Sequence, residues 1–231
     1  MQRFYKDVAV GAEADGFTVL LDGKPVRTPA RRLLLLPTRA LAEAVAEEWR
    51  AQGETLAADA MRLTRLATTV VDLMPTRRGD AIEEVAGFAD TDLLCYRASS
   101  PATLVERQEA SWQPWLDWAE RQYDARLQPA SGIMPVEQSE TALKALKAAV
   151  ARLGDWRLVG LHAATTALGS LILGLALERG AIDGERAFET AYLDELFEIE
   201  EWGEDAEQTR RHERLRADVA AAERFLRLLA A

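Results

Sequence analysis

Residues 158–177 read LVGLHAATTALGSLILGLAL, and none of these 20 positions carries a formal charge. The run is long enough to cross a bilayer, yet it also holds one histidine, two threonines, one serine and three glycines. A helix rich in small residues also suits the centre of a helical domain, where neighbouring helices approach closely. Because charged amphipathic stretches surround this single run, we expect a buried core helix from Asp155 to Arg179 and no insertion into a membrane.

On both sides of this run, apolar residues recur with helical spacing. Pro75 and Pro114 are each expected to break or interrupt a helix, because proline lacks an N–H and clashes with the preceding turn. The first expected helix has Thr38 as its N-cap and ends at Gly53. The others cover 61–73, 76–90, a segment beginning at Pro101 and interrupted at Pro114, 137–153, 155–179, 183–202 and 204–229.

The first 36 residues show strand signals instead. Their apolar segments are short, and an Asp-Gly pair between two of them is typical of a tight turn. Pro25 and Pro29 favour edges or turns, which indicates a small antiparallel sheet and not a buried parallel one. The segments are Phe17–Leu21, the turn Asp22-Gly23, Lys24–Thr28 and Leu33–Leu36.

These signals together predict an α+β fold in which the two kinds of structure are segregated. We expect a small N-terminal antiparallel β domain over residues 1–60, followed by a larger all-α helical domain over residues 61–231. The sequence leaves the boundary open anywhere between residues 37 and 75.

Composition limits the possible functions. The chain has 231 residues, 48% of them hydrophobic and 29% charged, as in an ordinary globular protein. Its 38 acids against 28 bases give a net charge of −10, which argues against a nucleic-acid partner. The single Cys95 excludes an internal disulfide and a cysteine zinc site. His162, expected in the core, and His212, expected on the surface, leave little room for a histidine metal centre.

No familiar catalytic motif occurs in the sequence: a phosphate-binding loop, G-x-G-x-x-G, H-E-x-x-H and G-x-S-x-G are all absent. We therefore name no catalytic residue, metal ligand or cofactor. The start, Met-Gln-Arg-Phe-Tyr-Lys, has neither an apolar region nor the composition of a presequence, so we expect a cytoplasmic protein.

Charge is concentrated in one segment: residues 181–213 hold twelve acids and three bases. On a single helix, Asp194, Glu198, Glu201 and Asp205 would fall within about 60° of one another and form an acidic stripe. One interpretation is a solvated face. The other is a docking surface for a basic partner, since such a field speeds encounter and rejects acidic surfaces.

Several segments in order along nearly the whole chain resemble the family of ATP synthase assembly chaperones that act on the alpha subunit of the catalytic head. They are Arg3-Phe-Tyr-Lys6, Leu21-Asp-Gly-Lys-Pro-Val-Arg-Thr-Pro29, Leu36-Pro-Thr38, Glu48-Trp49, Met61-Arg-Leu-Thr-Arg-Leu-Ala67, Thr91-Asp-Leu-Leu-Cys-Tyr-Arg-Ala98, Trp112-Gln-Pro114, Gly169-Ser-Leu-Ile-Leu173 and Glu201-Trp-Gly-Glu-Asp-Ala-Glu207. Mitochondrial members carry a presequence, whereas this chain begins almost at the first motif, so it looks like a bacterial member.

The resemblance implies a non-enzymatic chaperone that binds the free alpha subunit and shields its interface until the beta subunit replaces it. It also implies no cofactor, and we expect a monomer, although the sequence does not determine the oligomeric state. An important acid of the family lies near the Trp-Gly motif, which here corresponds to Glu201 or Glu200. We hypothesise that Glu201, Glu198 and Asp205 engage basic groups of the partner while Trp202 packs against it. The full candidate set is Asp194, Glu198, Glu200, Glu201, Trp202 and Asp205.

Two other classes remain open. An acid-pair hydrolase would need a deep pocket in the helical domain that contains carboxylates with raised pKa values. A membrane-attached scaffold would need residues 158–177 to face lipid.

Overall fold

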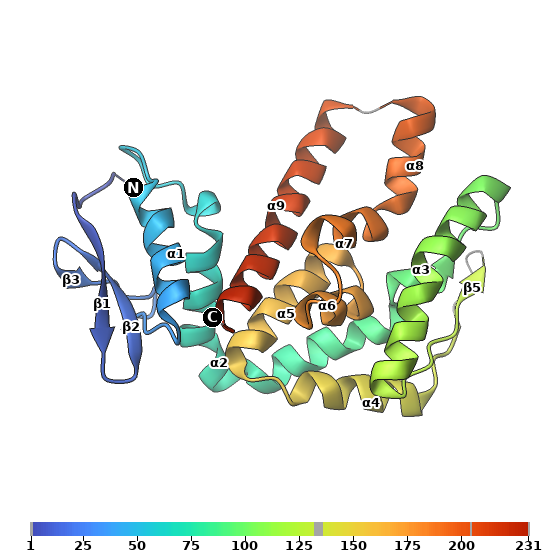
Figure 1. Cartoon of the computed structure of the whole chain (residues 1–231), viewed down its shortest axis with the longest axis horizontal. Helices are drawn as coiled ribbons and strands as arrows, with labels where there is room; N and C mark the ends of the chain where they lie inside the picture. Colours follow the sequence, from blue (N-terminus) through green and yellow to red (C-terminus); the bar gives the residue numbers. More distant parts are fainter. Residues whose placement is uncertain (1, 132–135, 204, 231) are drawn as a thin grey trace.

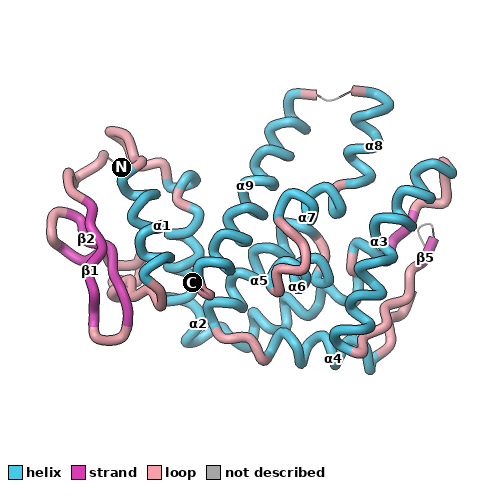
Figure 2. Tube along the Cα trace, in the orientation of Figure 1, coloured by secondary structure: helices cyan, strands magenta, loops and turns pink. Residues whose placement is uncertain are grey.

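The computed structural model of the chain describes residues 2–131, 136–203 and 205–230. A small antiparallel sheet at the N-terminus is followed by a larger helical region, which confirms the expected α+β class (Figures 1 and 2). The division at residue 60 stays a prediction.

The sheet has the strand order β1-β2-β3, with β1 at Val8–Glu13, β2 at Gly16–Leu21 and β3 at Lys24–Pro25. Asp22 and Gly23 turn the chain between β2 and β3 with positive φ values of 48° and 77°. Strand β1 was not predicted, because its sequence VAVGAE shows little alternation of polar and apolar residues. The segment at residues 33–36 contributes only single bridges, Arg27 with Leu33 and Phe17 with Leu36.

Helix α1, Arg39–Arg50, packs on β1 and β2 (Figure 1). Its N-cap is Thr38, as expected, with the hydroxyl oxygen accepting a hydrogen bond from the Leu41 N–H at 3.1 Å. The same hydroxyl donates to the Leu228 carbonyl at 2.7 Å, so the start of α1 is joined to the end of the last helix.

Pro75 does not break a helix: α2 runs continuously over Arg62–Gly87. Proline removes the hydrogen bond to the carbonyl four residues earlier, that of Val71. In the folded chain the Arg32 guanidinium donates to this carbonyl oxygen at 2.9 Å and replaces the missing partner. The predicted break was wrong because a residue from the N-terminal region compensates for the proline.

Pro114 likewise lies inside one helix, α3, which spans Ala102–Tyr123. Ala110, whose carbonyl loses its helical partner, is an exposed residue. Trp112 on this helix is fully buried, and its indole N–H donates to the Thr190 carbonyl at 2.8 Å. The short strands β4, Tyr96–Arg97, and β5, Ala130–Ser131, pair in parallel beside α3, and α4 covers Glu140–Ala151.

The uncharged run forms two helices instead of the one expected, α5 at Asp155–Leu168 and α6 at Leu171–Glu178. Gly169 ends α5 with φ 66°, and the Ser170 hydroxyl then caps α6 by accepting from the Leu173 N–H. Most residues of both helices are buried, which confirms the expected core position. No helix within the described residues has both the length and the apolar content needed to cross a bilayer.

Helices α7, Gly184–Ala191, α8, Leu193–Trp202, and α9, Ala206–Leu228, complete the chain. Helix α9 begins close to the expected start at residue 204, which lies outside the described residues. Helix α5 packs against α2, α6 and α9, so the uncharged run is at the centre of the helical region.

Candidate functional site

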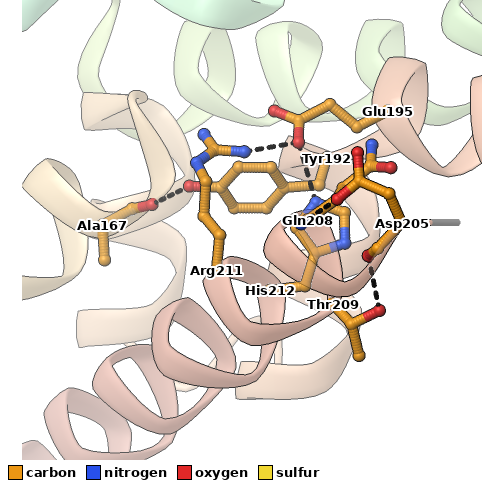
Figure 3. A network of polar contacts seen from close by, with 8 residues as sticks. All are labelled: Ala167, Tyr192, Glu195, Asp205, Gln208, Thr209, Arg211 and His212. Atoms are coloured by element: carbon orange, nitrogen blue, oxygen red, sulfur yellow. Dashed lines mark hydrogen bonds and ion pairs between the residues drawn. The ribbon is translucent and has the colours of Figure 1, made fainter.

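The helix expected over residues 183–202 is folded as two helices, because the chain changes direction at Tyr192 between α7 and α8. The acidic segment therefore extends over α7, α8 and the start of α9. The Tyr192 hydroxyl donates to the carbonyl of Ala167, near the end of α5, at 2.5 Å (Figure 3). Its ring lies 4.6 Å from the ring of Phe188. Tyr192 thereby anchors the start of α8 to the core.

Helices α8 and α9 form a hairpin that projects from the helical region, with their connected ends farthest out (Figure 1). Glu195 joins the two helices: one of its oxygens accepts from Arg211 at 2.5 Å and lies 2.7 Å from Nε2 of His212 (Figure 3). His212 is 2% exposed and packs edge-on against Phe188. The expected surface position of His212 was wrong, because the turn at Tyr192 places Phe188, Tyr192 and Glu195 against it.

The opposite side of α8 is held by α3. Gln108 is fully buried and donates to the Asp194 carboxylate at 2.7 Å. Arg107 forms an ion pair with Glu200 at 2.6 Å and lies over the ring of Phe197. Burial raises the pKa of Asp194, the hydrogen bond from Gln108 lowers it, and the nearby charge of Glu195 raises it further.

The two helices of the hairpin meet at Gly203, where φ is 86°, and Asp205. Asp205 caps α9: its carboxylate accepts from the N–H groups of Glu207 and Gln208 at 2.8 and 2.9 Å. These hydrogen bonds lower the pKa of Asp205. The acidic stripe is therefore not continuous, since Asp205 belongs to a different helix and Asp194 is turned toward α3.

Five of the six predicted site residues are exposed, but Glu200 and Asp205 have partners within the chain. The other three lie near the end of α8: Glu198, Glu201 and Trp202. We call this group the hairpin tip. Trp202 is 78% exposed, more than Phe4 at 64% or Leu73 at 49%. Among the described residues, neither Glu198 nor Glu201 forms an ion pair within the chain. The hairpin tip thus combines an uncovered aromatic ring with two solvated carboxylates.

The other three predicted residues have structural partners, and four residues that position α8 were missed: Arg107, Gln108, Glu195 and His212. In the sequence these four residues look like ordinary polar residues on solvated helix faces, and no local pattern marks them as residues that position α8. The partners of Gln108 and Arg107 lie 86 and 93 positions away, a separation at which helical periodicity carries no information.

The hairpin also borders an open groove of about 420 Å³ between α3, α7 and α8. Leu193, Leu196 and Phe197 provide its apolar wall, and Arg107 and Glu200 lie at its edge. Such a surface can take an apolar side chain beside the exposed hairpin tip.

The carboxyls with raised pKa values do not form an acid pair. Asp92 is fully buried and Asp194 is half-buried, and neither lines the groove beside the hairpin. Burial raises the pKa of the Cys95 thiol to about 12, so it is held protonated. Over the part of the chain that the structure describes, no three His, Cys, Asp or Glu side chains are grouped to hold a metal ion.

Comparison with known proteins gives consistent matches. The sequence model of the family described as ATP12 chaperone protein matches residues 2–120. The chain is 23% identical over 224 residues to the mitochondrial protein atp12 of Schizosaccharomyces pombe, covering 90% of this chain and 76% of that protein.

Two crystal structures are similar over nearly the whole chain. Atp12 of Paracoccus denitrificans has 40% identity and a TM-score of 0.92, covering 99% of this chain and 98% of its own. The Atu1473 protein of Agrobacterium tumefaciens has 40% identity and a TM-score of 0.93, covering 99% of this chain and 86% of its own.

Proposed function

The chain belongs to the ATP12 chaperone family, and from this premise we propose that it assists ATP synthase assembly by holding the free alpha subunit. The chaperone shields the apolar interface of that subunit from aggregation until the beta subunit takes its place. The proposed location is the cytoplasm of a bacterial cell. Holding a partner needs no catalytic group.

The hairpin tip is the observation that supports this proposal most directly. The indole of Trp202 is exposed. Tryptophan side chains of this kind often contribute a large part of the binding energy at protein interfaces. The carboxylates of Glu198 and Glu201 are available to pair with basic groups of the alpha subunit. Exposed ion pairs contribute modestly to affinity and more to the rate of encounter. A chaperone must release its client, and a contact of this kind suits reversible binding.

The groove beside the hairpin extends this surface. Leu193, Leu196 and Phe197 can receive an apolar side chain of the client next to the basic group that meets the hairpin tip. Asp194, Glu200 and Asp205 act indirectly in this proposal, because they fix the position of α8 and the start of α9.

The test is capture of purified ATP synthase alpha subunit by the tagged chain, with and without Glu201→Lys. We expect the unaltered chain to bind the alpha subunit and to reduce its aggregation in a light-scattering assay. The Glu201→Lys substitution places a cation opposite a basic group of the alpha subunit. We therefore expect at least roughly ten-fold weaker binding.

Glu13→Lys is the matched control, because Glu13 is exposed at the end of β1 and the charge change is identical. Failure of the unaltered chain to bind the alpha subunit would contradict the proposed client. Equal binding by the Glu201→Lys variant, with its fold intact by circular dichroism, would show that the hairpin tip is not part of the interface.

A further inference from the structure

A second uncovered surface lies where α5 packs against α2 and α9. Two adjoining hollows of about 360 and 370 Å³ occur there, and both are lined by Arg65, Leu66, His162 and Ala163. They therefore form one continuous depression, which we call the α2–α5–α9 groove. His162 was expected in the core, but its side chain is 33% exposed in this groove.

The floor of the groove is apolar. Leu66 and Ala163 line both hollows, Leu73 and Met74 continue the floor at one end, and Leu215 continues it at the other. Leu73 is 49% exposed, whereas Val70 and Met74 on the same helix are buried. An exposed leucine beside a concave apolar floor is typical of a surface that a partner covers.

The rim of the groove differs in charge from the rest of the chain. Four arginines line it, Arg62, Arg65, Arg77 and Arg214, against three carboxylates, Asp80, Glu84 and Asp218. A net positive rim is unusual in a protein whose net charge is −10.

Two of the three rim carboxylates are paired with arginines, and the third, Glu84, is exposed and lies 3.3 Å from Nε2 of His162. Asp218 accepts from Arg62 at 2.7 Å and also lies 3.6 Å from Arg65, and Asp80 pairs with Arg77 at 2.6 Å. Among the described residues Arg214 forms no ion pair, and it is exposed on α9. A partner that supplies carboxylates at this rim would complement it.

The dimensions of the groove suit a helix. Along α2 its lining extends from Arg62 to Glu84, which corresponds to about 33 Å at 1.5 Å per residue. That length accommodates about six turns of a partner helix, whose apolar face would cover Leu66 and Leu73 in the helix-in-groove mode.

We propose that the α2–α5–α9 groove binds an amphipathic helix of the client whose apolar face is flanked by carboxylates. This inference rests on the proposed function for the identity of the client and adds a second contact of opposite polarity. The hairpin tip selects basic groups and the groove selects acidic ones. Two patches of opposite charge on one chaperone fix the orientation of the bound client, because a reversed client would bring like charges together.

Two synthetic 18-residue helices with the same apolar face test the groove without relying on the client. One has glutamates along both flanks and the other has lysines. We expect the glutamate peptide to bind in fluorescence anisotropy and to lose at least roughly ten-fold in affinity with Leu73→Glu or Arg214→Glu. Phe4→Glu is the matched control, because Phe4 is 64% exposed and lies outside the groove.

A photo-crosslinking amino acid in place of Leu73 then tests the client itself. We expect a crosslink to the alpha subunit within an acidic amphipathic helix. Capture of the alpha subunit that depends on Glu201 but gives no crosslink from position 73 would overturn the groove and leave the proposed function intact. If the alpha subunit is not captured at all, the proposed function fails. The binding of the two peptides is then the only test of the groove. Equal binding of the glutamate peptide by the unaltered chain and the Leu73→Glu variant would overturn the inference.

Discussion

The carboxyl group of Asp92 joins two segments that are distant in the sequence. It accepts hydrogen bonds from the Leu94 N–H at 3.2 Å, the Ser170 hydroxyl at 2.8 Å and the Ile172 N–H at 3.1 Å. It therefore caps the start of α6 as well as its own short 3₁₀ turn, Leu93–Cys95. The side chain is completely buried, and this burial raises its pKa to about 6 despite the three donors.

This pKa predicts how Asp92 affects stability at different pH values. Between about pH 4 and 6 the carboxyl is ionised in the unfolded chain but still protonated in the folded one. The free energy of unfolding contributed by Asp92 is therefore greatest below pH 4 and falls by about 3 kcal/mol as the pH rises through 6. In urea titrations across this range, we expect the stability of the unaltered chain to decline relative to that of the Asp92→Asn variant.

Asp90→Asn is the control for this experiment, because Asp90 is exposed on the preceding turn. If the stability of the unaltered chain and that of Asp92→Asn change in parallel with pH, burial does not raise the pKa of the Asp92 carboxyl in this way.

Helices α5 and α6 approach their neighbours closely because two of their positions are glycine. A Cβ atom on Gly160 would lie 2.6 Å from Cδ2 of Leu226 on α9. A Cβ atom on Gly174 would overlap the Thr165 hydroxyl and lie 3.3 Å from the Thr165 backbone. The small residues that made the run resemble a membrane span thus allow close packing of one helix against another.

We expect Gly174→Ala to lower the free energy of unfolding by about 1–3 kcal/mol, because the added methyl has no room beside a backbone atom. Gly79→Ala is the matched control within α2, where no atom lies within 4 Å of the new Cβ. There alanine favours the helix, so we expect a gain of about 0.5–1 kcal/mol. Thermal or urea unfolding of both variants measures the difference. Equal effects would mean that α5 and α6 are not closely packed.

Over the whole molecule, negative charge is concentrated in α7, α8 and the start of α9. The segment 181–213 holds twelve of the 38 acids and only three of the 28 bases. Part of this charge is neutralised within the fold by Arg107 and Arg211, but the hairpin tip remains solvated. A field of this kind acts at long range and is weakened by salt.

We expect association with the alpha subunit to slow roughly ten-fold between about 50 and 500 mM NaCl, since salt screens the attraction. Combining Glu198→Gln with Glu201→Gln should reduce this salt dependence and leave the dissociation rate less affected. Stopped-flow or surface plasmon resonance measurements give both rates. An identical salt dependence in the double variant would place the attraction elsewhere on the chaperone.

Local patterns predicted much of the fold. The Asp22-Gly23 turn, the Thr38 cap and the central position of residues 158–177 all depend on neighbouring residues, and all were confirmed. Turn and cap preferences arise from backbone conformation and hydrogen bonds within a few positions.

The candidate site was only partly predictable. The exposure of Glu201 and Trp202 agrees with the expected acidic surface. The single stripe was wrong, since Tyr192 and Gly203 turn the chain on either side of α8. Helical periodicity assumes one continuous helix, and nothing local shows where Ala167 will accept a hydrogen bond from Tyr192.

The sequence by itself determined the segregated fold class, the burial of the uncharged run and the concentration of acid near the C-terminus, because each follows from composition and periodicity. Only the tertiary structure decided that Pro75 lies within a continuous helix, that His212 is buried and that Leu73 borders a groove. Each of these depends on a residue far along the chain, as when Arg32 supplies the hydrogen bond that Pro75 removes from Val71. Such contacts form only when the helices pack, and their physical cause is the need of every buried polar group for a partner.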